Sequence, residues 1–228
     1  MNDFIFNFLR SIHILAGFTA LFAGPVAMVT HKGGRKHRLS GKIYFWGMAI
    51  VAATALGMSI LRTNHFLLLI AIFSFYFSLT GYRALYQKKR TAGNGSRWDR
   101  DLAVVMLLAS AVMMIYGIIN FAQLGVVMIV FGGIGAVLGV QDLRKWMTLQ
   151  PSKYQWFYDH IARMGASYIA TLSAFSVVNF TFIPDVIRWL WATAFGTPLI
   201  IYTVRQYRAR FEAGKKPDDV ATFSIKGE

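Results

Sequence analysis

Histidine and arginine are the residues whose type and spacing could support chemistry in this chain. His160, Arg163 and Ser167 follow one another at intervals of three and four, which places them on one face of a helix. His37 and Arg38 are adjacent in a basic segment much earlier in the chain. Imidazole can bind a metal, switch its charge near neutral pH or hold an anion when protonated, and guanidinium binds anionic groups. The candidate residues for a small anionic or amphiphilic ligand are His37, Arg38, His160, Arg163, Ser167 and Arg83.

The same residues leave two kinds of cofactor open. His37 and His160 could bind one b-type haem if they lie at the same depth on facing helices, and a quinone could occupy the same place. With Asp159 they would supply the three protein ligands that a catalytic zinc site usually takes. The chain has no His-x-x-x-His pair, so the sequence signal for zinc is weak. The absence of cysteine excludes disulfides, thiolate metal sites and iron–sulfur ligation. The alternative without a ligand is a rim of arginines whose charges reach the membrane surface.

A second candidate position lies nearer the N-terminus. Arg10 and His13 are three residues apart in the first apolar segment. At ~1.5 Å per residue, His13 lies about 14 Å from the start of that segment. A histidine at that depth is either packed and hydrogen-bonded against protein, or it is a ligand or proton-carrying site, and the sequence allows both.

The elements that must position these residues are long apolar helices. Hydrophobic residues make up 56% of the 228 residues and charged ones 15%, which is far too little polar surface for a soluble domain. A spanning helix needs roughly 20 apolar residues. We expect an all-α membrane protein with seven transmembrane helices at Phe4–Val29, Lys42–Leu61, Phe66–Tyr86, Leu102–Phe121, Leu124–Val140, Phe157–Phe182 and Val186–Tyr202.

Positive charge is concentrated on alternate connections, which predicts the orientation. The net charge of the chain is +14. Most lysines and arginines follow the first, third, fifth and seventh apolar segments, whereas the other connections hold only Arg62 and Arg188. Basic loops stay in the cytoplasm. We therefore expect an external N-terminus, a cytoplasmic C-terminus and contact with anionic lipids at the cytoplasmic face. Topology explains the basic loops, so we expect no nucleic-acid partner. The seven-helix domain should cover residues 1–212, and residues 213–228 should form a polar, disordered tail.

Two stretches resemble a family of bacterial integral membrane proteins of unknown function. The first runs from Gly24-Pro25 to His37-Arg38-Leu39-Ser40-Gly41-Lys42-Ile43-Tyr44, and the second is Asp159-His160-Ile161-Ala162-Arg163-Met164-Gly165-Ala166-Ser167-Tyr168. The resemblance implies a helical fold in the bacterial inner membrane. It directs attention to His13, His37, Arg38, His160 and Arg163, and it implies no reaction.

Several functions therefore remain open from the sequence. A cytoplasm-facing pocket could bind its ligand in transport or sensing. The same place could hold haem or quinone in a membrane oxidoreductase, or zinc in a hydrolase acting on the inner leaflet. An assembly factor without a small ligand is also consistent with the sequence, so whether the protein is an enzyme stays open.

Overall fold

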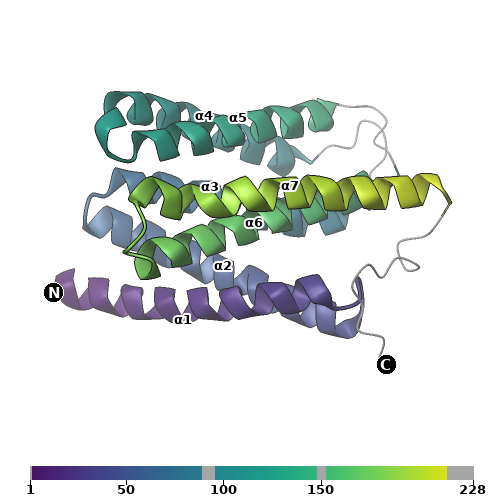
Figure 1. Ribbon diagram of the computed structural model, residues 1–228, viewed down its shortest axis with the longest axis horizontal. Helices are drawn as coiled ribbons and strands as arrows, with labels where there is room; N and C mark the ends of the chain where they lie inside the picture. The colour runs from purple at the N-terminus through teal and green to yellow at the C-terminus, as the bar shows by residue number, and fades with distance from the viewer. Residues whose placement is uncertain (1, 89–95, 148–152, 215–228) are drawn as a thin grey trace.

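The computed structural model describes residues 2–88, 96–147 and 153–214 (Figure 1). Every regular element in these ranges is helical, which confirms the all-α class. The long helices are α1 (Asn2–Val29), α2 (Arg35–Leu61), α3 (His65–Ala84), α4 (Arg97–Ile119), α5 (Val126–Met147), α6 (Gln155–Asn179) and α7 (Asp185–Glu212). A short 3-10 helix (Leu85–Gln87) follows α3, and a π-helical turn (Phe121–Gly125) joins α4 to α5. Most of the predicted tail, residues 215–228, lies outside the described residues.

Six of the seven long helices, α1 to α6, are long and apolar enough to cross a membrane. This supports a multi-pass membrane protein. Helix α7 is not among the six, because Arg188 lies near its start and Gly196-Thr197-Pro198 interrupts its apolar stretch. A seventh span through α7, and the orientation of the bundle, stay predictions.

Several helices extend beyond their apolar segments. Helix α2 begins at Arg35 rather than Lys42, so His37 and Arg38 belong to its first turn and not to a connection. Helix α5 continues to Met147, which places Asp142 inside it rather than after it. Backbone hydrogen bonds do not stop where hydrocarbon stops, so a boundary drawn from hydrophobicity falls short at charged helix ends.

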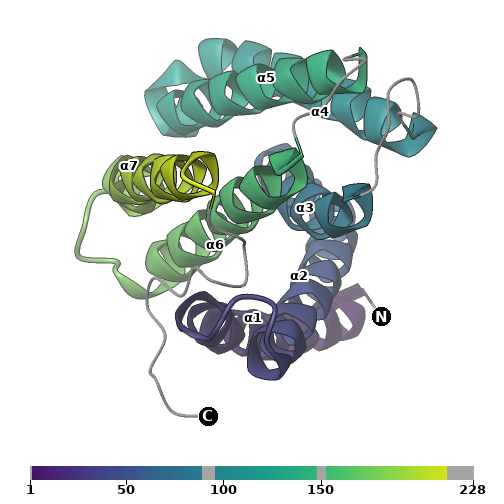
Figure 2. The same ribbon diagram turned by 90° about the vertical axis from the view of Figure 1, so that its right-hand side faces the viewer.

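The helices run antiparallel in sequence order (Figure 1). Helix α1 packs on α2, α4 packs on α5, and α6 packs on α7, while α3 contacts α2, α6 and α4 from the middle of the bundle (Figure 2). One consequence is that the last turns of α1, α3, α5 and α7 share an end of the bundle with the first turns of α2, α4 and α6. We call this the basic end, because the connections rich in lysine and arginine lie there.

Candidate functional site

His37 and His160 lie next to each other at the basic end. Their ring centres are 6.3 Å apart and the ring planes are nearly perpendicular, at 75°. His37 comes from the first turn of α2 and His160 from the second turn of α6. The two residues are 123 positions apart in the sequence, so the fold brings together the two stretches that carry the family resemblance.

Hydrogen bonds to two further helices fix both rings. His37 Nδ1 lies 2.8 Å from the Ala27 carbonyl oxygen of α1, and His160 Nδ1 lies 2.9 Å from the Gly81 carbonyl oxygen of α3. A carbonyl can accept but not donate, so each Nδ1 carries a proton, and in the neutral form of the ring Nε2 presents its lone pair. Within the described ranges neither Nε2 has a hydrogen-bond partner. Each ring of the pair therefore keeps one basic nitrogen that the fold does not use within these ranges.

Positive charge flanks this histidine pair. Lys32 and Lys88 are near enough for their charges to act on His160. The Lys32 ammonium donates to the carbonyl oxygens of Ala27 and Met28 at the end of α1, and burial lowers the pKa of this lysine below its usual value. These charges make the surroundings of the pair favourable for an anionic group.

A buried cluster of hydroxyl groups lies one to three turns further along the same helices. The Tyr44 hydroxyl is 2.7 Å from Ser167 Oγ and 3.2 Å from Thr171 Oγ1, and Ser78 Oγ is 2.5 Å from Ser167 Oγ. All four side chains are buried. The cluster joins α2, α3 and α6 directly beneath the histidine pair, and it gives Ser167 a structural partner instead of an open pocket.

Arg163 is buried and forms an ion pair. Its Nη2 donates to Asp142 Oδ1 at 2.6 Å and to the Leu138 carbonyl oxygen at 3.3 Å. The other oxygen of Asp142 accepts a hydrogen bond from the Tyr76 hydroxyl at 2.5 Å. Only 4% of the Arg163 side chain and 18% of the Asp142 side chain are exposed. Arg163 therefore connects α6 to α5 and α3, with its charge already neutralised by a carboxylate.

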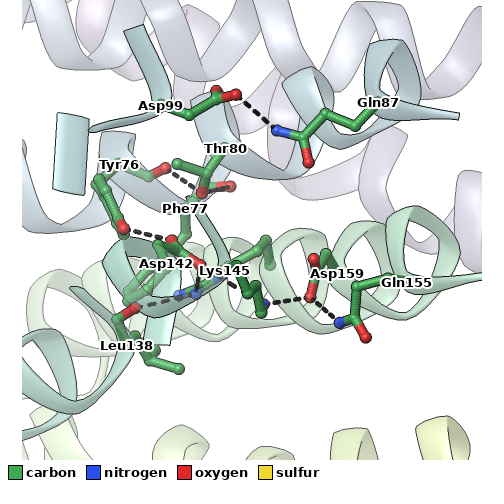
Figure 3. Close-up of polar contacts among 11 residues, drawn as sticks. Tyr76, Phe77, Thr80, Gln87, Asp99, Leu138, Asp142, Lys145, Gln155 and Asp159 are labelled. Atoms are coloured by element: carbon green, nitrogen blue, oxygen red, sulfur yellow. Dashed lines mark hydrogen bonds and ion pairs between the residues drawn. The ribbon is translucent and has the colours of Figure 1, made fainter. Parts of the chain in front are cut away.

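Further ion pairs extend this arrangement toward the basic end (Figure 3). Lys145 contacts Asp159 at 2.5 Å and Asp142 at 3.5 Å, and Gln155 also donates to Asp159. Arg83 pairs with Asp99 at 2.8 Å, which ties the end of α3 to the start of α4. Among the described residues, the side-chain contacts of Asp159 and Arg83 are with these ion-pair partners rather than with the histidine pair, and both residues hold helix ends together.

The remaining candidates lie apart from the pair. Arg38 and Arg10 are exposed. His13 is half-buried between α1 and α2, where its Nδ1 lies 3.1 Å from the Val51 carbonyl oxygen and 3.0 Å from Thr54 Oγ1. The geometry supports the packed, hydrogen-bonded account of His13. Across the described part of the chain, no group of three or more His, Cys, Asp or Glu side chains could hold a metal ion.

Sequence reasoning missed the partners of these residues. Tyr44, Tyr76 and Ser78 complete the polar core, yet the sequence pattern makes none of them a candidate. Tyr44 ends the first resemblance stretch, so its position was a usable signal. Asp142 was assigned to a connection, and a helix extended by two turns would have placed it four residues from Leu138 on the face toward α6.

Comparison with known proteins identifies a related family over part of the chain. Residues 10–98 match the family described as "Predicted membrane protein (DUF2306)". The match spans most of α1, all of α2 and α3, and the start of α4, so it includes His13 and His37 but not His160. No curated protein and no solved structure matches the chain. These findings support a membrane protein similar to an uncharacterised family, and they assign it no activity.

Proposed function

We propose that this protein is a multi-pass membrane protein that binds a small anionic or amphiphilic ligand at the His37–His160 pair, in transport or sensing. The observation that carries the proposal is the tautomer of the two rings. Both Nδ1 atoms are held by carbonyl groups, so both Nε2 atoms remain to accept a hydrogen bond from a ligand or to bind an anion after protonation. The flanking lysines favour negative charge at this position.

The structure supports a changed role for the arginines in this proposal. Arg163 pairs with Asp142 through Nη2 and so positions α6, while its buried Nη1 has no hydrogen-bond partner among the described residues. Arg38 is exposed one residue after His37, where it would attract an anion toward the pair rather than enclose it. The ligand would therefore meet the histidines directly.

Ligand-dependent thermal unfolding of the purified protein tests this. Oleate and inorganic phosphate serve as probes for amphiphilic and simple anions. The variants are H37Q and H160Q, because glutamine is polar and of similar size but cannot take up the proton with which an imidazole binds an anion. H31Q is the matched control, since His31 is exposed in the same basic segment.

We expect a probe at about 100 times its Kd to stabilise the wild type and H31Q by about 2.7 kcal/mol, and to leave H37Q and H160Q unchanged. Equal stabilisation of all four proteins, or no stabilisation of the wild type by either probe, would overturn the proposal.

One b-type haem between the two histidines is the second candidate. Two imidazoles on opposite sides of one metal ion, with bonds of about 2 Å, have ring centres about 6 Å apart. The observed separation is 6.3 Å, and metal-binding histidines commonly donate their other N–H to a carbonyl group. A Soret band in the purified protein that disappears in H37A and H160A would support this candidate, and a colourless preparation from haem-supplied cells would remove it. A three-ligand zinc site has no comparable support in the described residues.

We also propose that α7 crosses the membrane and that the basic end faces the cytoplasm. The chain has no native cysteine, so single cysteines report accessibility without further substitutions. R38C and A213C should react with an impermeant maleimide from the cytoplasmic side, and T63C and P184C from the outside, because Pro184 precedes α7 and Ala213 follows it. A213C reacting from the same side as P184C would show that α7 does not cross and would overturn the seventh span.

A further inference from the structure

A cavity of about 370 Å³ lies at the basic end, away from the histidine pair. The first turns of α6 and the last turns of α7 form its walls. Its lining includes Lys153, Tyr154, Tyr158, Arg208, Phe211 and Glu212. None of these residues takes part in the site proposed above, so the cavity requires its own explanation.

Two cations at the cavity are oriented by aromatic rings. Lys153 Nζ lies 5.4 Å from the centre of the Tyr154 ring, and Arg208 Cζ lies 5.3 Å from the centre of the Tyr158 ring. A cation over a ring face keeps its charge while the ring restricts its position. Both N–H-bearing groups therefore remain available to an anion. The negative charge of Glu212, which also lines the cavity, should weaken the binding of an anion. Removing that charge should therefore strengthen anion binding.

Two lining residues of the cavity, Tyr158 and Phe211, are part of a buried aromatic cluster. Phe157 and Tyr207 complete this cluster, against which Val204 packs. A cavity with cations at its opening and an aromatic wall behind them matches a ligand that has an anionic head and an apolar body. A simple anion would leave the apolar wall unused.

The position of the cavity matches the depth of lipid headgroups. Lys88 lies 4.4 Å from the centre of the Trp156 ring beside it, and Tyr86 and Trp98 at the same end are 75% and 70% exposed. Exposed tryptophan and tyrosine among basic residues are typical of the membrane interface. Toward the middle of the bundle, α7 exposes Ile201 and Leu199, which can contact acyl chains.

From these observations we infer that the cavity binds the phosphoryl headgroup of an anionic phospholipid. Arg208 and Lys153 contact the phosphoryl oxygens, and the acyl chains follow the exposed apolar face of α7. Basic pockets between membrane helices on the cytoplasmic side are suited to such headgroups. The inference does not depend on the histidine pair, since no residue is shared.

Native mass spectrometry of the full chain in detergent micelles tests this inference. Phosphatidylglycerol, phosphatidylcholine and inorganic phosphate are added separately, and the affinity of each is measured from the bound fraction. The variants are R208Q, E212Q and R205Q, of which the last is the matched control, because Arg205 is exposed on α7 and outside the cavity lining. Circular dichroism checks that each variant keeps its helices.

The wild type should bind phosphatidylglycerol in preference to phosphatidylcholine. R208Q should weaken phosphatidylglycerol about fivefold, E212Q should strengthen it, and R205Q should leave it unchanged. Equal weakening by R208Q and R205Q would mean general attraction to a basic surface and would overturn the site. The lipid assignment would be overturned by any of three results. These are inorganic phosphate binding as tightly as phosphatidylglycerol, phosphatidylcholine binding equally well, or weaker phosphatidylglycerol binding in E212Q.

Discussion

Replacing Arg163 by methionine should destabilise the protein through the carboxylate that the substitution leaves behind. Methionine keeps most of the length and volume of the side chain but removes its charge and donors. Asp142 would retain the Tyr76 hydroxyl at 2.5 Å and the Lys145 ammonium at 3.5 Å. Both Arg163 and Asp142 are largely withdrawn from solvent, so water cannot replace the lost partner fully.

The size of the effect follows from burial. Removing one partner of a buried ion pair costs about 3–5 kcal/mol, and we expect R163M near the lower limit because Lys145 remains. D142N should cost more, because Arg163 is the more buried partner and would keep its charge. The double variant R163M/D142N should lose less than either single variant, since no uncompensated charge remains.

An exposed ion pair of the same length provides the control. Arg62 Nη2 and Asp3 Oδ1 are also 2.6 Å apart, but 56% and 81% of their side chains are exposed. R62M should therefore cost less than about 1 kcal/mol. Unfolding by sodium dodecyl sulfate in mixed micelles gives all four free energies. The reasoning fails if R163M costs no more than R62M, or if the losses of the two single variants simply add in the double variant.

Four further substitutions test local packing and backbone conformation in the same unfolding assay. A Cβ at Gly24 would approach the Tyr168 ring to 2.6 Å, so Gly24→Ala should cost about 1–3 kcal/mol, whereas Gly41→Ala, with open space around it, should stabilise α2 slightly. Tyr44→Phe removes a buried hydroxyl bound to two others and should cost about 1 kcal/mol. Thr63 has a φ of 48°, so Thr63→Gly should stabilise the turn after α2 by up to about 1 kcal/mol. A stabilising Gly24→Ala, or a destabilising Thr63→Gly, would contradict these expectations.

The apolar segments predicted the helices well because hydrocarbon imposes one solution on a spanning chain. Backbone groups in lipid must bond within the segment, so each long apolar run is a helix. The charged ends follow another rule. Residues 35–41 and 141–147 lie outside the predicted apolar segments, where hydropathy gives no signal, although the helices continue through them. For this reason the apolar pattern leaves Asp142 outside α5.

The candidate site could be predicted in its residue types but not in its pairing. Helical spacing correctly placed Arg163 and Ser167 on one buried face of α6. Spacing within one helix cannot reveal which group on another helix meets that face. Arg163 therefore seemed available to a ligand, although Asp142 of α5 neutralises it. The proximity of His37 to His160 likewise depends on how α2 and α6 cross, and the residue pattern within one helix does not predict that crossing.

Packing accounts for most of the residues that carry the family resemblance. Gly24 allows the close approach of the Tyr168 ring, Tyr44 bridges hydroxyl groups, and Arg163 neutralises a buried carboxylate. The Tyr44 hydroxyl contacts two other hydroxyl groups, whereas Arg163 bonds through Nη2 and its buried Nη1 has no hydrogen-bond partner among the described residues. In His37 and His160 a carbonyl group likewise occupies one nitrogen of each ring, and the other nitrogen is not used by the fold in the described part of the chain. A leucine or phenylalanine would fill the same space without two polar atoms to desolvate. The unused nitrogens are therefore the strongest reason to seek the ligand at this pair.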